Sequence, residues 1–306
     1  MKKASFILST IWPLAAFAGD FPDVAGAPGS TAISHTDLRF VAWANGYLPP
    51  QYGTGVDDIW KTPLLGLGPA TMDPMHIVGL GNGGRMTLFF PHPIRDGQGA
   101  DFAVFENSFN HTFLELAFVE VSSDGVNFYR FPAISDTVEP AGGFGGIDAT
   151  DIHNLAGKYR GGFGTPFDLD EIVDAPLLDK ENVRFVRIVD IVGDGNTNDS
   201  RGTAIYDPWP VEGSGGFDLD AIGVIHQNDG PFRVTRAAAA GSTFTLEWES
   251  NPGSSYRIET STTLDPVESW LPVDQVAGST LSGGTVFPAP ADPAEPRRFW
   301  RVVRLD

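Results

Sequence analysis

Acidic side chains interrupt several apolar segments of this chain, and their types and spacing suit a chemical role. Glu106 and Asn107 end the apolar run that begins at Asp101, and Asp218 and Asp220 lie two residues apart in a later run. Residues two apart on a strand share one face, so these two carboxylates point the same way. A carboxylate in such a place needs hydrogen-bond donors, a cation or a metal as its partner. The sequence therefore leaves two alternatives, a metal site and a set of caps on backbone amides.

A second acidic set lies in a glycine-bearing loop. Its short side chains are Asp190, Asp194, Asn196, Asn198 and Asp199. Calcium takes six to eight oxygen ligands, and Asp and Asn side chains at alternate positions wrap such an ion well. The match to an EF-hand loop is partial, because Asp199 stands where Gly is required and Ile205 where Glu is required. Because Asp and Asn also stabilise ordinary turns, calcium binding and turn formation both stay open.

Catalytic motifs are absent from the sequence. The six histidines have no metalloprotease spacing, and no serine-hydrolase elbow or phosphate loop occurs. The pair His153 and Lys158, in the long segment 130–165, comes closest to a catalytic pair, although a surface or turn role also suits it. Gly79-x-Gly81-x-x-Gly84 matches a dinucleotide fingerprint, but a β-branched and aromatic run follows it instead of a helix, so we expect a hairpin turn.

The composition indicates short strands joined by many turns. The 306 residues include 36 Gly and 24 Pro, and 11% of them are aromatic, which predicts an all-β chain. The formal charge of −19 excludes a nucleic-acid partner, because the chain could not neutralise a phosphate backbone, and it favours cation binding. The absence of cysteine excludes disulfides, thiol catalysis and thiolate metal sites.

The N-terminus reads as a signal peptide over residues 1–18. Lys2 and Lys3 form a positive region, an apolar run follows, and Ala16-Phe17-Ala18 matches a cleavage site. No later stretch approaches the ~20 apolar residues that a span requires. We therefore expect a chain exported by a bacterium, in the periplasm, at the cell surface or outside the cell, with no transmembrane segment after cleavage.

The strand pattern is clearest in residues 101–125. In the strand expected over 114–121, Leu116 and Phe118 share one face, whereas Ala117, Val119 and Val121 share the other. Apolar residues on both faces predict a central strand that is buried on both sides or covered by a loop. The excursion over residues 130–165 is long enough to carry a function or small elements of its own. Asp168 and Glu171 predict a capped turn near Ile172.

A change of pattern near residue 230 predicts two domains. Residues 19–228 hold long apolar strands, and residues 227–231 read as a linker. In residues 229–306, apolar and polar residues alternate at short intervals, which is typical of a small antiparallel sandwich.

The segments 101–107, 114–125 and 216–223 resemble a family of exported bacterial cell-surface proteins, some of which carry a C-terminal sorting tail. The same segments are similar to the galactose-binding-like jelly roll. Residues 232–305 resemble a fibronectin-III-like accessory module. The resemblance implies an all-β fold, a jelly-roll sandwich followed by a smaller sandwich, in the cell envelope. The chain ends at Arg304-Leu305-Asp306 without the apolar helix and basic cluster of sorted members, so membrane anchoring is not implied.

We expect a non-catalytic binding or structural module, calcium-stabilised, whose partner is an extracellular glycan or an envelope polymer. The ligand would lie on aromatic residues of the long loops, because sandwich proteins commonly bind through loops on a rigid scaffold. These residues are Phe144, Tyr159, Phe163, Tyr206 and Trp209. The alternatives are a polysaccharide-active enzyme that uses acids such as Glu106 or Asp218, and a purely architectural envelope protein.

Overall fold

The computed structural model describes residues 19–228, 233–241, 243–250, 254–264, 270–278, 284–290 and 298–305. The expected signal peptide, residues 1–18, and most of the expected linker lie outside these ranges. Among the described residues, no helix has the length and apolar character needed to cross a membrane. The fold is all-β, as the sequence predicts, and its helical turns are short 3₁₀ segments. They are η1 (Asp58–Trp60), η2 (Pro63–Gly66), η3 (Ala149–Asp151), η4 (Leu169–Glu171) and η5 (Lys180–Asn182).

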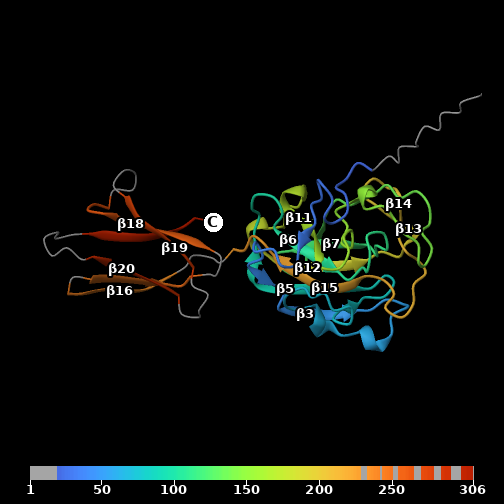
Figure 1. Ribbon diagram of the computed structural model, residues 1–306, viewed down its shortest axis with the longest axis horizontal. Helices are drawn as coiled ribbons and strands as arrows, with labels where there is room; N and C mark the ends of the chain where they lie inside the picture. Colours follow the sequence, from blue (N-terminus) through green and yellow to red (C-terminus); the bar gives the residue numbers. More distant parts are fainter. Residues whose placement is uncertain are drawn as a thin grey trace, which may run out of the picture.

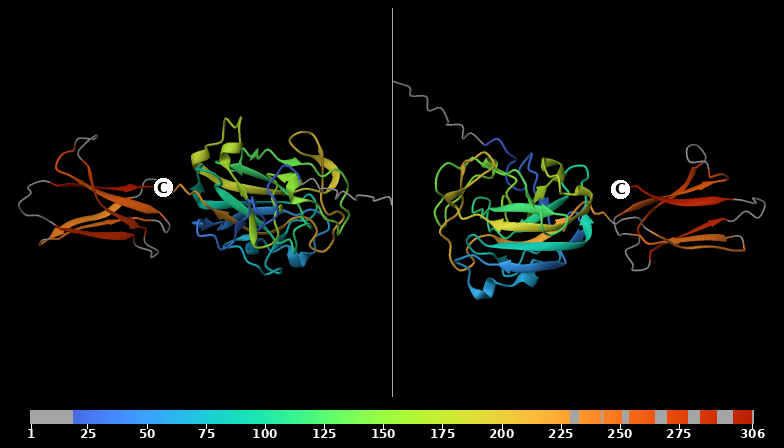
Figure 2. Two further views of the ribbon diagram at one scale, coloured as in Figure 1. Left: turned by 45° about the horizontal axis from the view of Figure 1, so that its top comes forward. Right: turned by 180° about the vertical axis from the view of Figure 1, so that it is seen from behind.

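Two antiparallel sheets form the larger body (Figures 1 and 2). The first has the order β1-β11-β6-β15-β2, with β4 also paired to β15. Its strands are β1 (Ile33–Ser34), β2 (Ala42–Trp43), β4 (Val78–Gly79), β6 (Phe102–Glu106), β11 (Phe163–Phe167) and β15 (Asp218–Val224). The second has the order β3-β5-β12-β7-β8. Its strands are β3 (Gly46–Gln51), β5 (Arg85–Ile94), β7 (Ala117–Ser122), β8 (Tyr129–Arg130) and β12 (Val183–Asp190).

From β5 to β15 the long strands alternate between the two sheets, so the chain crosses the sandwich repeatedly. Both sheets contribute to the main core, for example Val104 and Ile222 from the first and Val119 and Ile188 from the second. Burial of these aliphatic side chains is the main stabilising contribution to such a sandwich. The core therefore fixes the positions of the strand ends. The loop side chains next to these ends are held in place with them.

The strand expected over 114–121 begins three residues later, as β7. Its faces are as predicted: Val119 and Val121 enter the main core, whereas Leu116 and Phe118 pack in a second core. The excursion over residues 130–165 contains β9 (Ile134–Ser135), β10 (Ile152–His153) and η3, and it contributes Ile147, Ile152 and Leu155 to that second core. Strand pairing starts late because the Leu116 amide donates to the Asp207 carboxylate instead of to a neighbouring strand.

The turns follow the sequence expectation with one correction. Asp124 accepts hydrogen bonds from the Val126 and Asn127 amides and closes the β7–β8 hairpin. Gly81 and Gly83 have φ of 77° in the tight turn between β4 and β5. Because these two strands belong to different sheets, the turn crosses the sandwich and is not the hairpin that we expected.

The last six strands form two three-stranded sheets, drawn in orange and red in Figure 1. One sheet has the order β16-β17-β20 and the other β19-β18-β21. The strands are β16 (Val234–Ala240), β17 (Thr243–Trp248), β18 (Ser255–Ser261), β19 (Leu271–Ala277), β20 (Thr285–Pro290) and β21 (Phe299–Arg304). Trp248 and Tyr256, from different sheets, pack in one core, which makes this part a small sandwich.

Candidate functional site

A cavity of about 570 Å³ lies beside β1 and β11, at the edge of the first sheet. Its lining comes from the N-terminal segment, the excursion over residues 130–165, the end of β11 and η4. The residues are Phe21, Pro22, Ser30, Thr31, Ala32, Ile33, Arg39, Ala100, His153, Asn154, Lys158, Thr165, Pro166, Asp168 and Glu171. Both members of the His153 and Lys158 pair, which the sequence singled out, therefore face this cavity.

The His153 ring contacts the Glu171 carboxylate in the lining. Nε2 of His153 lies 3.3 Å from Oε2 of Glu171, and the Asn154 side-chain amide donates to the same oxygen. The hydrogen bond from His153 lowers the pKa of Glu171, with burial acting against it. The Phe21 ring stacks on the His153 ring at 5.1 Å between centroids. Glu171 is thus held ionised and in a fixed orientation.

Lys158 is almost fully buried in the same lining. Its Nζ donates to the Ile152 carbonyl at 2.6 Å, and burial lowers its pKa to about 8. The Tyr159 ring lies 5.5 Å from Nζ, and the Tyr159 hydroxyl is hydrogen-bonded to Thr31 Oγ1 at 2.9 Å. One of the three N–H groups of Lys158 is used by Ile152, so the ammonium retains donors for a ligand.

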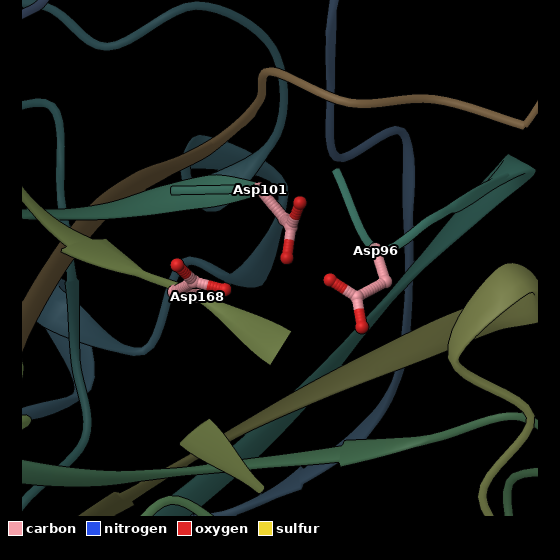
Figure 3. Close-up of side chains that lie close together, drawn as sticks. All are labelled: Asp96, Asp101 and Asp168. Carbon is pink, nitrogen blue, oxygen red and sulfur yellow. The ribbon is translucent and has the colours of Figure 1, made fainter. Parts of the chain in front are cut away.

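Three aspartates gather next to the cavity, where β5 and β11 end and β6 begins (Figure 3). Carboxylate oxygens of Asp96, Asp101 and Asp168 lie within 4.8 Å of one another. The two Asp101 oxygens are hydrogen-bonded to the Gly97 amide, the Leu169 amide and His226 Nδ1, each at 2.7 Å. Burial raises the pKa of Asp101 to about 6, and these hydrogen bonds oppose the rise. We refer to this group as the three-aspartate cluster.

The other two members of the three-aspartate cluster also have local partners. Lys180 Nζ lies 3.8 Å from Asp96. Asp168 caps η4 by accepting from the Asp170 amide at 3.0 Å, as the sequence predicts. The cluster therefore ties strand ends together. Asp101 could have been recognised as the polar residue that opens an apolar strand, but nothing in the sequence joins it to Asp96.

Three of the acids that the sequence proposed as metal ligands, Glu106, Asp190 and Asp218, lie at the opposite end of β6. Leu219 of β15 pairs with Glu106, which places Asp218 next to that strand end. Asp190, at the end of β12, accepts from the Gly83 amide at 2.6 Å and the Phe217 amide at 2.7 Å. Asp207 joins them through the Leu116 amide at 2.8 Å. The structure thus brings these carboxylates to one end of the sandwich.

Several of these carboxylates are caps on backbone amides, one of the alternatives that the sequence left open. Glu106 accepts from the Ser108 amide at 2.7 Å, and Asp220 accepts from the Thr71 amide at 2.9 Å. Burial raises the pKa of Asp190 and of Asp220 to about 7. Asn107 points elsewhere and donates to the Pro74 carbonyl at 3.1 Å.

Glu115 is the residue that the sequence analysis missed at this end. Its side chain is buried, and its Oε1 has no hydrogen-bond partner. Asp218 Oδ1 likewise has none. Burial, followed by the nearby Asp218 carboxylate, raises the pKa of Glu115 to about 11. We call Glu106, Glu115, Asp190, Asp207 and Asp218 the buried acid cluster. A glutamate between two leucines in an apolar run was the signal that could have identified Glu115.

The glycine-bearing loop forms the hairpin of β13 (Asp194–Asn198) and β14 (Ala204–Tyr206). Asp194 accepts from both the backbone amide and the side chain of Asn196. Asp199 accepts from the Arg201 and Thr203 amides and points into the fold. Within the described residues, this loop brings no three carboxylates within 4.8 Å of one another. Calcium binding by Asp194, Asn196, Asn198 and Asp199 stays a prediction.

The five aromatic residues expected to form a ligand face do not share one surface. Tyr159 is 1% exposed, whereas Phe144 is 90% exposed and packs beside Phe113. Phe163 lies under the Arg160 guanidinium, with 4.7 Å from its carbon to the ring centre. Tyr206 is in β14, and Trp209 is exposed in the loop that follows. Among the five, Tyr159 lies next to the cavity, through its hydroxyl contact with a lining residue.

No family model and no curated protein matches this chain. Among solved structures, the chain is similar to a beta-1,2-glucanase from Parabacteroides distasonis, with 12% sequence identity and a TM-score of 0.24. The match covers 73% of this chain and 28% of the glucanase chain. The chain thus spans under a third of that protein's length, and at this TM-score the likeness supports no statement about function.

Proposed function

We propose that this chain is an exported, non-catalytic module that binds an extracellular glycan or envelope polymer through the cavity beside β1 and β11. The observation that carries the proposal is the composition of the cavity lining, which combines carboxylates, cationic donors and apolar side chains. A volume of about 570 Å³ falls within the usual range for small-ligand pockets.

The lining suits a neutral sugar. Each sugar hydroxyl donates and accepts hydrogen bonds, and Glu171 and Asp168 supply acceptors while Lys158 and Arg39 supply donors. Both signs of charge are present, so the cavity does not demand a charged ligand. Pro22 and Ile33 add apolar surface for the C–H groups of a sugar ring. The contact from His153 holds Glu171 in place before a ligand arrives, which reduces the ordering required on binding.

The test is a glycan array followed by calorimetry with the glycans that bind. Glu171→Gln keeps the shape of the side chain and removes its charge, so we expect affinity to fall roughly tenfold or more. Glu120→Gln is the matched control, because Glu120 pairs with Arg130 on the second sheet and does not line the cavity. A panel in which no glycan binds, or in which both variants bind like the wild type, would refute the proposal.

An enzyme acting on the same polymer is the second candidate. Glu171, whose pKa is lowered, and the buried Lys158, whose pKa is also lowered, line one cavity with His153, and clustered groups with perturbed pKa values are frequent at active sites. Glu106 and Asp218, the acids that the sequence suggested for this role, do not line it. Release of reducing ends from a polysaccharide panel, lost in Glu171→Gln and retained in Glu120→Gln, would favour the enzyme. If neither binding nor release occurs, an architectural role is left.

A further inference from the structure

Four strand ends converge at the buried acid cluster. Glu106 ends β6 and Asp218 opens β15, and these strands pair in the first sheet. Asp190 ends β12, where it pairs with Ala117 at the start of β7 in the second sheet. The hydrogen bond from the Phe217 amide to Asp190 Oδ1, at 2.7 Å, joins the two sheets at this point. Glu115, two residues before β7, is carried to the same end of the sandwich.

Glu115 and Asp218 differ from the rest of the cluster because part of each carboxylate lacks a donor. Asp190, Asp207 and Glu106 accept from backbone amides. Glu115 is only 5% exposed, and its Oε1 has no partner. Ser214 neighbours the Asp218 carboxylate, but Asp218 Oδ1 is also without a partner.

The charged groups that act on Glu115 are all acids. The electrostatic influences on its carboxyl come from Asp218, Glu106, Asp207 and Asp190, and all of them disfavour ionisation. Among the described residues, no Lys or Arg forms an ion pair with any of these five acids. Burying an ionised carboxylate without a partner is strongly unfavourable. Either a bound cation or a retained proton is needed to neutralise the buried carboxylates.

A cation bound by these groups would be coordinated by oxygen ligands alone. Carboxylate and carbonyl oxygens select hard ions such as calcium and magnesium over zinc or copper. Magnesium demands near-ideal octahedral geometry, whereas calcium accepts six to eight oxygens in an irregular arrangement. Irregular loops and strand ends surround this cluster, which favours calcium.

We propose that Glu115 and Asp218 bind a calcium ion between the two sheets, with Glu106 as a third carboxylate. The structure adds Glu115 to the acids noted in the sequence and leaves Asp190 and Asp207 as caps on the surrounding backbone. Glu106, Glu115 and Asp218 do not bring three ligand oxygens within 4.8 Å of one another, so binding requires at least one side chain to move inward. The site is separate from the cavity proposed to bind a glycan.

The test uses the full chain, freed of metal with a chelator and then titrated with CaCl₂ or MgCl₂. We expect millimolar calcium to raise Tm by roughly 5 °C, as it would for a site of the affinity common in extracellular modules. Magnesium should give a smaller shift. Terbium luminescence provides a second readout that does not depend on unfolding.

Two variants and a control make the test specific. Glu115→Gln and Asp218→Asn should each weaken terbium and calcium binding at least tenfold, whereas Asp96→Asn, in the three-aspartate cluster, should keep the wild-type response. Two results would overturn the proposal: no calcium-dependent shift in the wild type, or a shift that both variants retain. If Glu115→Gln fails to fold, Asp218→Asn decides the matter. A wild type that is insensitive to calcium yet binds extra protons on folding would show that the carboxyls share protons and hold no cation.

Discussion

Buried acids lie at both ends of strand β6, and the two groups differ in their hydrogen-bond partners. Asp101, just before the strand, has both oxygens occupied by backbone amides and His226, and it belongs to the three-aspartate cluster. Glu106, at the other end, belongs to the buried acid cluster, where Glu115 and Asp218 each keep an oxygen without a partner. The two clusters therefore differ in the number of local hydrogen-bond donors, which is why we propose a ligand site at the buried acid cluster and a structural role for the three-aspartate cluster.

The largest effect is expected from Asp101→Ala. It removes the acceptor of the Gly97 and Leu169 amides and of His226. Leaving these donors without an acceptor reduces the free energy of unfolding by about 3–5 kcal/mol, because each buried unsatisfied group costs about 1–3 kcal/mol. Urea denaturation of the metal-free protein measures this. A loss below about 1 kcal/mol would mean that the three-aspartate cluster does not tie the strand ends.

Glu115→Met is expected to change the free energy of unfolding in the opposite direction, by raising it. Methionine has a similar volume and no carboxyl group, so the substitution removes a buried acid with an unpartnered oxygen. In chelated protein at pH 7 we expect the free energy of unfolding to rise by about 1–3 kcal/mol. The same urea experiment compares it with Asp101→Ala. If both variants lose stability alike, the contrast between the two ends of β6 is wrong.

The pH dependence of stability isolates Asp101. Its pKa is about 6 in the folded protein and 3.8 without burial. An acid whose folded pKa is raised contributes stability that is fully present below pH 3.8 and is lost as the pH rises through 6. Asp101→Asn cannot ionise, so its Tm should fall less between pH 4 and pH 7 than that of the wild type. Equal slopes for the two proteins would contradict the assignment.

The smallest effect is expected at threonines. Thr165 Oγ1 is buried without a hydrogen-bond partner, so Thr165→Val should leave stability unchanged or raise it by up to about 1 kcal/mol. Thr150→Val is the matched control, because Thr150 Oγ1 accepts from the Gly19 amide and donates to Asp148. The control should lose about 1 kcal/mol. Thermal melts of the two variants, measured together, show whether the presence of partners decides the sign for neutral groups too.

Local patterns in the sequence predicted the strands and the directions of their side chains. The alternation around Val119 assigned both faces of β7 correctly, and Asp168 was recognised as a cap. The predicted start of β7 was wrong, because the Leu116 amide donates a hydrogen bond to Asp207, which is 91 residues away. No short-range pattern carries that information.

The candidate sites were harder to predict from the sequence, because they too depend on contacts between residues far apart in the chain. His153 and Lys158 stood out, but the cavity that they line also needs Phe21 and Ala100 from distant segments. Glu115 was overlooked because it lies in an apolar run, and Asp218, the carboxylate that acts on it most strongly, is supplied by a strand from the other sheet. Spacing along the chain is informative about groups on one element, whereas these sites are assembled from several.

The excursion over residues 130–165 has a practical consequence for anyone who labels or modifies this protein. Long surface loops are the usual places for tags, dyes and inserted peptides. Here Ile147, Ile152 and Leu155 of that segment pack against β7, so an insertion would open a core. The tip of the β7–β8 hairpin, where Val126 is 80% exposed, is the better attachment point.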